Sequence, residues 1–368
     1  MMFYFSPLVI YIPVGIYLFH FFRRFLKLFV SEDQKLPTNL SSILFAVLCA
    51  VAGWRVYGLG AVIILHFTVI MIFLEGVNQI VKRVLGTERR GGFWKIVFES
   101  GLVGILIVSI VFSYGYFNMH HIRETKYSVR SSKIPSGKIR IAQISDLHMG
   151  TTMDVDALKD NCDRIQKQQP DMFVLTGDIF DERTGRSLME EAVQVLAGVS
   201  CQYGIYYVWG NHDTNRYRYE PEYTMDELRQ TLIKNGIHVL EDEAVQVTEQ
   251  FAIVGRYDVS NVTKRKSIQE LVQGIDPSCF LLLLDHRPVE LKENAGAGVD
   301  LQMSGHTHAG QIWPTGQLGE IIGVTEKNYG MERIGNFHII VSSGIAGWGY
   351  GIRTGGHSEF VIADVEAG

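Results

Sequence analysis

Carboxylates, imidazoles and an amide follow a series of short apolar runs in the second half of the chain. Residues Met172–Asp181 read Met-Phe-Val-Leu-Thr-Gly-Asp-Ile-Phe-Asp, and the first five of them predict a buried strand. Gly177 permits a sharp turn after this strand, so that Asp178 stands just past the strand's end. A carboxylate in that position could bridge two metal ions.

Other expected strand ends supply further groups of the same kind. The polar residues that follow them are Asp146, His148, Asn211, His212, Asp213, Asp285, His286, His306 and His308. The preceding runs are Lys138–Ile144, Ile205–Trp209, Phe280–Leu284 and Leu301–Ser304. Open α/β sheets usually place their sites at the edge where strands end. We therefore expect five strand ends to deliver oxygen and imidazole ligands to one place.

Each of these short motifs is common in proteins when it stands alone. His306 and His308 lie two residues apart, so both side chains point to the same side of an extended segment and can face a metal pair. An isolated Asp-x-His is usually a surface accident, and an isolated Gly-Asn-His-Asp is usually a turn. What indicates a metal site is the conjunction of all five motifs, in order and each at a strand end.

The ordered set resembles the five diagnostic motifs of the calcineurin-like metallophosphoesterase superfamily. The resemblance spans roughly Ile139 to Val365. Membrane-attached bacterial phosphodiesterases of that superfamily are the most similar, because Gly305–Gln311 and Val341–Ala346 resemble their extended motifs. Two departures are visible: Ala309 stands where glycine is common, and Ser343 stands where an arginine is common.

The resemblance implies a fold and a metal site. The fold is an α/β, four-layer αββα sandwich; the residues themselves indicate only the alternation of strands and helices from Lys138 onward. A shared carboxylate can hold two ions about 3.5–4 Å apart, which suits in-line attack at phosphorus. Oxygen and imidazole ligands admit Mn, Fe, Zn or Mg as the two divalent ions. By resemblance, one ion takes Asp146, His148, Asp178 and His308, and the other takes Asp178, Asn211, His286 and His306.

The same resemblance implies roles for the groups beside the ligands. A hydroxide between the ions would attack phosphorus, since metal coordination lowers the pKa of water toward about 7. His212 would protonate the leaving oxygen or stabilise charge in the transition state. We expect Asp213 to orient His212, and Asp181 to support a metal ligand or the strand-end turn through hydrogen bonds.

Hydrophobic residues are unevenly distributed along the 368-residue chain. Four apolar stretches lie near residues 2–22, 41–57, 60–80 and 97–117, and each is about as long as a membrane-spanning helix requires. We expect a bundle of about four transmembrane helices over residues 1–117, a linker over 118–137, and the metallophosphoesterase domain over 138–368. The net charge of -5 gives no electrostatic case for binding nucleic acid, and the four cysteines do not form a disulfide or zinc-site pattern.

The distribution of basic residues around the four expected spans predicts the topology. Most of the flanking arginines and lysines fall on one side, so the positive-inside bias places the N-terminus and the globular domain outside the cytoplasm. The leading hypothesis is a multi-pass enzyme of the cell membrane that hydrolyses phosphoesters, with a substrate that bilayer attachment suggests is lipid-linked. A pyrophosphohydrolase of the UDP-diacylglucosamine type is an alternative, but its substrate lies on the cytoplasmic leaflet. A non-catalytic sensor or scaffold is a second alternative, which the retention of all seven ligands and His212 disfavours.

Two further segments each allow more than one interpretation. Asn215–Tyr223 is a polar aromatic loop that could grip a phosphate or nucleobase through Arg216 and Arg218, or could be an ordinary surface loop. Trp348–Arg353 could line the pocket, could dip toward lipid, or could simply form tight glycine turns.

Overall fold

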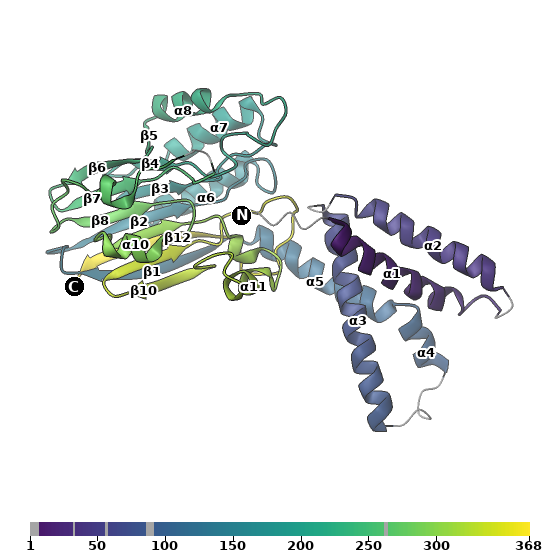
Figure 1. Ribbon diagram of the computed structural model, residues 1–368. Helices are drawn as coiled ribbons and strands as arrows, with labels where there is room; N and C mark the ends of the chain where they lie inside the picture. Colours follow the sequence, from purple (N-terminus) through teal and green to yellow (C-terminus); the bar gives the residue numbers. More distant parts are fainter. Residues whose placement is uncertain (1–6, 32–33, 56–57, 86–91, 261–263) are drawn as a thin grey trace. The chain divides into compact units, whose positions relative to one another are not determined.

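The computed structural model describes the whole chain except residues 1–6, 32–33, 56–57, 86–91 and 261–263 (Figure 1). The chain divides into two compact units, Met1–Tyr114 and Gly115–Gly368. The described part of the first unit is helical, and the second unit contains two β-sheets.

Each sheet of the second unit has six strands among the described residues. The first has the order β1 (Arg123–Ser131), β12 (Glu359–Ala367), β2 (Lys138–Ile144), β3 (Met172–Thr176), β4 (Ile205–Val208) and β5 (Ile237–Val239). The second has the order β10 (Gly330–Ile334), β11 (Phe337–Val341), β9 (Leu301–Ser304), β8 (Phe280–Leu284), β7 (Phe251–Gly255) and β6 (Glu243–Thr248). Strands β2, β3 and β4 pair in parallel, as do β7, β8 and β9. The carboxyl ends of these strands therefore meet at one edge of each sheet.

Helices cover the outer faces of both sheets, so the expected four-layer αββα sandwich is confirmed (Figure 1). The helices on the first sheet are α6 (Val155–Lys167), α7 (Arg186–Ala197) and α8 (Met225–Lys234), and those on the second are α9 (Ile268–Leu271) and α10 (Leu291–Gly296). Strand β8 is apolar along its whole length because both of its faces are buried. Phe280, Leu282 and Leu284 pack between the sheets, whereas Leu281 and Leu283 pack toward α9 and α10.

Local sequence signals account for two of these helices. In α6 the residues at spacings of three and four, Leu158, Cys162 and Ile165, are buried. At the start of α8, the Thr224 hydroxyl accepts from the Glu227 N–H and the Glu227 carboxylate accepts from the Thr224 N–H. This capping box satisfies backbone donors that the first turn of the helix leaves free.

Residues 118–137, expected to form a linker, are largely part of the second unit. Residues 118–120 end helix α5 (Leu102–His120), and β1 pairs in parallel with β12 along its whole length. Val129 is the one fully buried residue of β1, and the strand alternates only between half-buried and exposed residues, so its apolar signal in the sequence is weak. What holds it is backbone hydrogen bonding to a strand near the other end of the chain.

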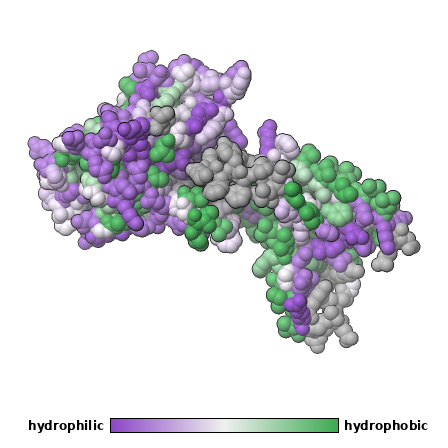
Figure 2. Space-filling model, viewed as in Figure 1, coloured by the Kyte–Doolittle hydropathy of each residue, from purple (hydrophilic) through white to green (hydrophobic). Residues whose placement is uncertain are grey.

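Among the described residues, three helices are long and apolar enough to cross a membrane: Lys35–Ala52 (α2), Leu59–Val81 of α3 (Leu59–Leu85), and α5. Figure 2 shows hydrophobic residues on the visible face of this helical region. The expected span at 2–22 overlaps α1 (Pro7–Leu26), which is not among the three, and its first residues lie outside those described. About four spans are therefore not found in the described part of the chain.

The expected span at 97–117 is also shifted. Residues 97–99 belong to a separate helix, α4 (Gly92–Glu99), and α5 begins only at Leu102. Gly101, with φ +77, interrupts the helical path because a left-handed residue cannot continue a right-handed helix. The break keeps Glu99 out of the apolar helix.

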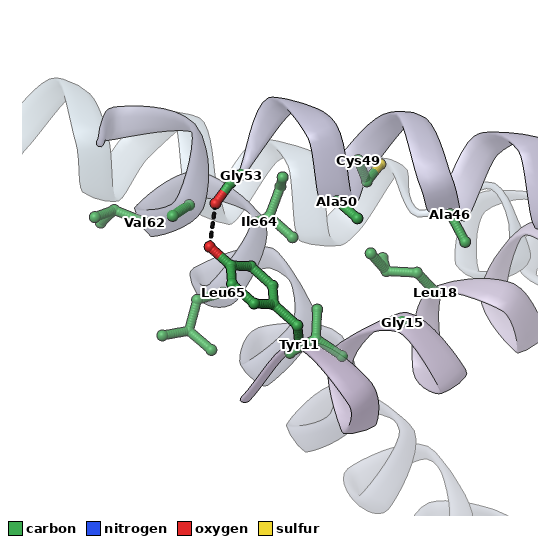
Figure 3. Close-up of a pocket in the computed structure, with 12 residues that line it drawn as sticks. Tyr11, Gly15, Leu18, Ala46, Cys49, Ala50, Gly53, Val62, Ile64 and Leu65 are labelled. Atoms are coloured by element: carbon green, nitrogen blue, oxygen red, sulfur yellow. Dashed lines mark hydrogen bonds between the residues drawn. The ribbon is translucent and has the colours of Figure 1, made fainter. Parts of the chain in front are cut away.

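A pocket lies between α1, α2 and α3 of the first unit (Figure 3). Small residues such as Gly15, Ala46 and Ala50 leave this space open, and the walls are mainly apolar. The Tyr11 hydroxyl donates to the Gly53 carbonyl. The pocket contains none of the carboxylates or imidazoles that the sequence motifs supply, so it is not the expected centre of chemistry.

Candidate metal centre

Six of the seven expected ligands come together in two groups. The first cluster is Asp146, His148 and His308, and the second cluster is Asp178, His286 and His306. Within each cluster one potential ligand atom from every residue lies within 4.8 Å of the others. These residues follow β2, β3, β8 and β9, so the strand ends deliver them to one place as expected from the sequence.

The strand-end loops hold an unusual backbone conformation. Five of the six cluster residues have positive φ: Asp146 (54°), His148 (42°), Asp178 (52°), His306 (73°) and His308 (51°). Such a conformation costs about 1–3 kcal/mol for a residue other than glycine and persists only where the surroundings impose it. Here the Asp146 N–H donates to the Gly177 carbonyl and the His148 N–H to the Asp178 carbonyl, each at 3.0 Å. The loops thus fix one another.

Gly177 is required where β3 ends. Its φ is +83, and a Cβ at this position would lie 2.6 Å from His286 Nδ1 and 2.7 Å from the Gly210 nitrogen. No real side chain fits in that space. Glycine therefore allows the loops after β3, β4 and β8 to approach one another closely.

The first cluster is arranged as a chelating group. His148 Nε2 and His308 Nε2 face each other at 3.3 Å, and His308 Nε2 lies 3.5 Å from Asp146 Oδ1. Two imidazole nitrogens gain little from direct contact unless a proton or a cation stands between them. Burial raises the pKa of the Asp146 carboxyl, and a cation would stabilise its charged form. The donor set therefore fits a divalent ion.

Asp181 lies behind His148 of the first cluster. Its Oδ2 lies 3.4 Å from His148 Nδ1 and accepts from the Thr151 hydroxyl at 3.0 Å. Carboxylates commonly orient a metal-binding imidazole through its second nitrogen. His148 Nε2 is thereby directed into the cluster.

The second cluster has the same chemistry. His286 Nε2 lies 3.2 Å from Asp178 Oδ2 and 3.2 Å from His306 Nδ1. Its Nδ1 donates to the Thr176 carbonyl at 2.9 Å, which leaves Nε2 to face the cluster. Burial opposes a charge on His286, but Asp178 outweighs it and raises the pKa of the ring to about 10. A cation is favoured beside this carboxylate.

Asn211, the seventh expected ligand, is buried near the second cluster's loops. Its Oδ1 accepts from Arg287 Nη2 at 3.1 Å, and Arg287 Nε donates to Asp258 Oδ2 at 2.6 Å. The sequence motifs gave no role to Arg287 or Asp258. The only available signal was that Arg287 directly follows His286.

His212 lies beside the clusters, and hydrogen bonds fix both its backbone and its ring. Its N–H donates to Asp178 Oδ1 at 2.8 Å, and its Nδ1 donates to Glu182 Oε1 at 2.7 Å. Burial disfavours the charged ring, yet Glu182 outweighs burial and the pKa of His212 is raised. The rings of Trp348 and Tyr217 flank it, with centroids 5.3 and 5.2 Å away.

The expectation that Asp213 orients His212 is wrong in this structure. Asp213 Oδ2 accepts from the N–H groups of Asp178 and Gly210, both at 2.7 Å, and Oδ1 accepts from the Phe180 N–H at 2.9 Å. These three donors occupy the carboxylate, so it joins the loops after β3 and β4. Glu182, which the sequence did not single out, takes the orienting position.

The side chain of Arg353 gives the Trp348–Arg353 segment a structural role that its glycine turns alone do not explain. Its guanidinium is fully buried and donates to the carbonyls of His308, Ser343 and Ala346. Burial lowers its pKa to about 10. The residue therefore braces the loop that carries His308.

The two departures from the family pattern have structural explanations. The Ser343 side chain is buried, and its hydroxyl donates to the His357 carbonyl, so it does not face a substrate. Ala309 adopts φ +51 and is buried. Gly356 makes room for it, since a Cβ on Gly356 would lie 2.6 Å from the Ala309 Cβ.

The loop at 215–223 reaches the site through an aromatic ring. Arg218 pairs with Glu222 at 2.9 Å, and Arg216 donates to the Ser260 carbonyl while stacking over Tyr217. Tyr217 itself packs on His212. In this structure both arginines have protein partners, which does not support the interpretation that they grip a phosphate.

Comparison with known proteins gives the same assignment. Residues 139–310 match the family model described as calcineurin-like phosphoesterase. An uncharacterised metallophosphoesterase of Aquifex aeolicus is 28% identical over 270 residues, covering 71% of this chain and 98% of that protein. YkuE of Bacillus subtilis, also an uncharacterised metallophosphoesterase, is 28% identical, covering 70% and 90%. A transmembrane protein with a metallophosphoesterase domain from Danio rerio is 23% identical, covering 69% and 59%.

Among solved structures, a dimetal phosphatase from Danio rerio is 13% identical, covers 56% of this chain and 87% of its own, and superposes with a TM-score of 0.35. At this score the likeness adds nothing to the fold already visible in the two sheets. The family match and the two clusters define a metal-dependent phosphoester hydrolase. The chain carries a calcineurin-like metallophosphoesterase domain, and three helices among its described residues are long and apolar enough to cross a membrane.

Proposed function

We propose that this chain is a membrane-anchored phosphodiesterase that works with two divalent ions. The observation that carries the proposal is the position of Asp178 between the clusters. Its Oδ2 lies 3.2 Å from His286 Nε2 in the second cluster and 3.9 Å from His148 Nε2 in the first. One carboxylate thus faces both groups of imidazoles. The proposed ligands are Asp146, His148, Asp178, Asn211, His286, His306 and His308.

Two divalent ions, when bound, supply positive charge for the phosphoryl oxygens and activate water as a nucleophile. His212 is positioned to hold the proton that the leaving oxygen takes, because Glu182 fixes Nδ1 and leaves Nε2 free to face a substrate. Asp213 keeps the loops after β3 and β4 together, so that His212 and Asp178 retain their relative positions. Trp348 and Tyr217 flank His212 and restrict water beside it.

The test is hydrolysis by the purified full chain after chelation and after addition of Mn. Panels of phosphomonoesters, phosphodiesters and lipid pyrophosphates separate the candidate activities. We expect diester hydrolysis that chelation abolishes and Mn restores. Activity that survives thorough chelation would contradict the dimetal mechanism, and a marked preference for monoesters would contradict the diesterase assignment.

We also propose that the chain is multi-pass with its catalytic domain outside the cytoplasm, as the distribution of basic residues predicts. Reporter fusions at the C-terminus test the side directly. Activity of a periplasm-type or cell-surface reporter supports the proposal. A cytoplasmic reporter signal would contradict it and would favour the pyrophosphohydrolase of a nucleotide-linked lipid.

A further inference from the structure

The segment that follows the His306-x-His308 motif exposes an unusual number of apolar side chains. We call residues 312–324, which include α11 (Thr315–Ile321), the apolar segment. Its exposed residues are Trp313 (64%), Leu318 (50%), Ile321 (79%), Ile322 (71%) and Val324 (75%). Figure 2 shows a hydrophobic patch where α11 lies in Figure 1. A contiguous exposed patch of this kind in a folded domain indicates an interaction surface.

The outer face of the apolar segment is poor in charged residues. Its one ionisable side chain is Glu320, whose Oε1 accepts from the Asn328 N–H at 2.6 Å. A surface for a soluble protein partner usually has a polar rim. A face with a tryptophan, several β-branched residues and a single carboxylate is better suited to the boundary between lipid headgroups and acyl chains.

Hydrogen bonds tie the apolar segment to the end of α5, a candidate membrane span. The Trp313 N–H donates to the Thr354 hydroxyl at 3.0 Å, and the next residue back, Arg353, donates its N–H to the Gly115 carbonyl at 2.9 Å. Asn118 Nδ2 donates to the Arg353 carbonyl at 3.0 Å. All these residues belong to the second unit. The segment is therefore linked through residues 353–354 to the last turns of a helix that is long and apolar enough to cross a membrane.

The end of α5 shows the aromatic residues typical of a membrane boundary. Tyr116 and Phe117 are 61% and 64% exposed in its last turns. Tyrosine and other aromatic rings concentrate at the level of lipid headgroups. This position gives an independent reason to expect a bilayer surface close to residues 115–120.

The inner side of the apolar segment borders the metal centre. A pocket beside the second cluster is lined by Arg287 and His306 and by Gly316 and Gly319 of the apolar segment. The same short stretch thus has an exposed apolar face and a face that forms the wall of a pocket at the second cluster.

We propose that residues 312–324 rest in the surface of the bilayer and so present the phosphoester headgroups of membrane lipids to the pocket beside His306. The contact with lipid stands on the exposed residues and the link to α5. The choice of a lipid phosphoester as the substrate class rests, in addition, on the proposed function.

The lipid contact is tested by fluorescence of the full chain in lipid nanodiscs with one chain per disc. The contribution of Trp313 is the difference between the emission of the wild type and of Trp313→Phe. We expect lipids brominated near the headgroup end of their acyl chains to quench this difference, and Ile321→Glu with Ile322→Glu to abolish the quenching. Ile233→Glu, a matched change of an exposed isoleucine on α8, should leave it intact.

Two results would overturn the lipid contact. One is a Trp313 contribution that brominated lipids do not quench. The other is protection of Trp313 from aqueous quenchers only in discs that hold two chains, because a second copy, and not lipid, would then cover the segment.

The substrate class is tested with the same variants and two substrates. Ile321→Glu with Ile322→Glu should lower hydrolysis of a phosphodiester lipid embedded in vesicles by about 10-fold, since bilayer contact is lost. Hydrolysis of soluble bis(p-nitrophenyl) phosphate should stay within about 2-fold of wild type, which also shows that the variant is folded. Equal loss on both substrates, or no loss on the lipid, would contradict the proposed substrate class. If the wild-type protein hydrolyses neither substrate, the proposed function is contradicted instead. The fluorescence test of lipid contact does not depend on that result.

Discussion

The two clusters contain the same chemical groups but differ in their supports. Each has one carboxylate and two imidazoles. In the first cluster His148 Nδ1 faces the carboxylate of Asp181, whereas in the second His286 Nδ1 faces the carbonyl of Thr176. An anionic partner makes an imidazole a stronger metal ligand than a neutral carbonyl does. The first cluster should therefore bind its ion more tightly.

An arginine lies beside each cluster. Near the second cluster, Arg287 donates to the amide oxygen of Asn211. The same oxygen keeps a second lone pair that can bind an ion. Burial is the largest cause that holds the pKa of His306 well below its usual range, and the charge of Arg287 is the next. In the first cluster Arg353 is directed to backbone carbonyls and does not occupy any proposed ligand atom. An arginine therefore contributes to lowering the pKa of one histidine in each cluster, and the difference between the clusters lies in the partners of His148 and His286.

Asp178→Asn should have the largest effect because it alters the carboxylate that faces both clusters. We expect hydrolysis to fall by more than about 10³-fold, since the charge that holds the ions together is lost. Elemental analysis should show fewer than two ions per chain. Wild-type activity in this variant would contradict the proposal that Asp178 binds both ions.

His212→Ala should lower turnover without changing either cluster. The loss of a positioned proton donor costs about 10²–10⁴-fold in kcat. Metal content should remain that of the wild type, because the ring of His212 is not among the cluster residues. Loss of metal together with activity would instead make His212 a ligand.

Asp181→Asn should separate the two clusters. Removing an anion behind a metal-binding histidine weakens metal affinity by about 10–100-fold. A calorimetric titration with metal should show weaker affinity in the tighter of the two binding steps and unchanged affinity in the other. Asp160→Asn, on the exposed face of α6, is the matched control. Equal weakening of both steps would show that the clusters do not bind independently.

Glu182→Gln should have the smallest of these effects. The amide still accepts a hydrogen bond from His212 Nδ1 but no longer favours the charged ring, so kcat should fall by about 10-fold. Metal content and KM should hold. Glu190→Gln, an exposed change on α7, should be silent. A silent Glu182→Gln would mean that His212 needs no carboxylate partner.

The sequence was sufficient to predict the parts of the site that lie at strand ends. Asp146 and Asp178 each follow a buried apolar run, and parallel pairing of β2 with β3 brings their ends together. His286 follows a similar run, β8, in the other sheet, and the packing of the two sheets brings it to the same place. The remaining parts depend on contacts between distant segments. Glu182 reaches His212 only when the loop after β3 folds against the loop after β4, and Arg353 lies 45 residues from the His308 carbonyl that it binds.

The same distinction applies to the fold. Strands with continuous or alternating apolar residues, such as β2 and β8, are evident from the sequence. Strand β1 is not, because its stability comes from backbone bonds to β12 and its exposed residues are polar. The identity of Asp213 as a loop brace was likewise hidden, since its partners are backbone N–H groups that any sequence would supply.

Anomalous diffraction from crystals of the full chain loaded with Mn tests the central claim most directly. The account predicts two peaks, one among Asp146, His148 and His308 and the other among Asp178, His286 and His306, with Asp178 next to both. A single peak, or two peaks that do not share Asp178, would contradict it.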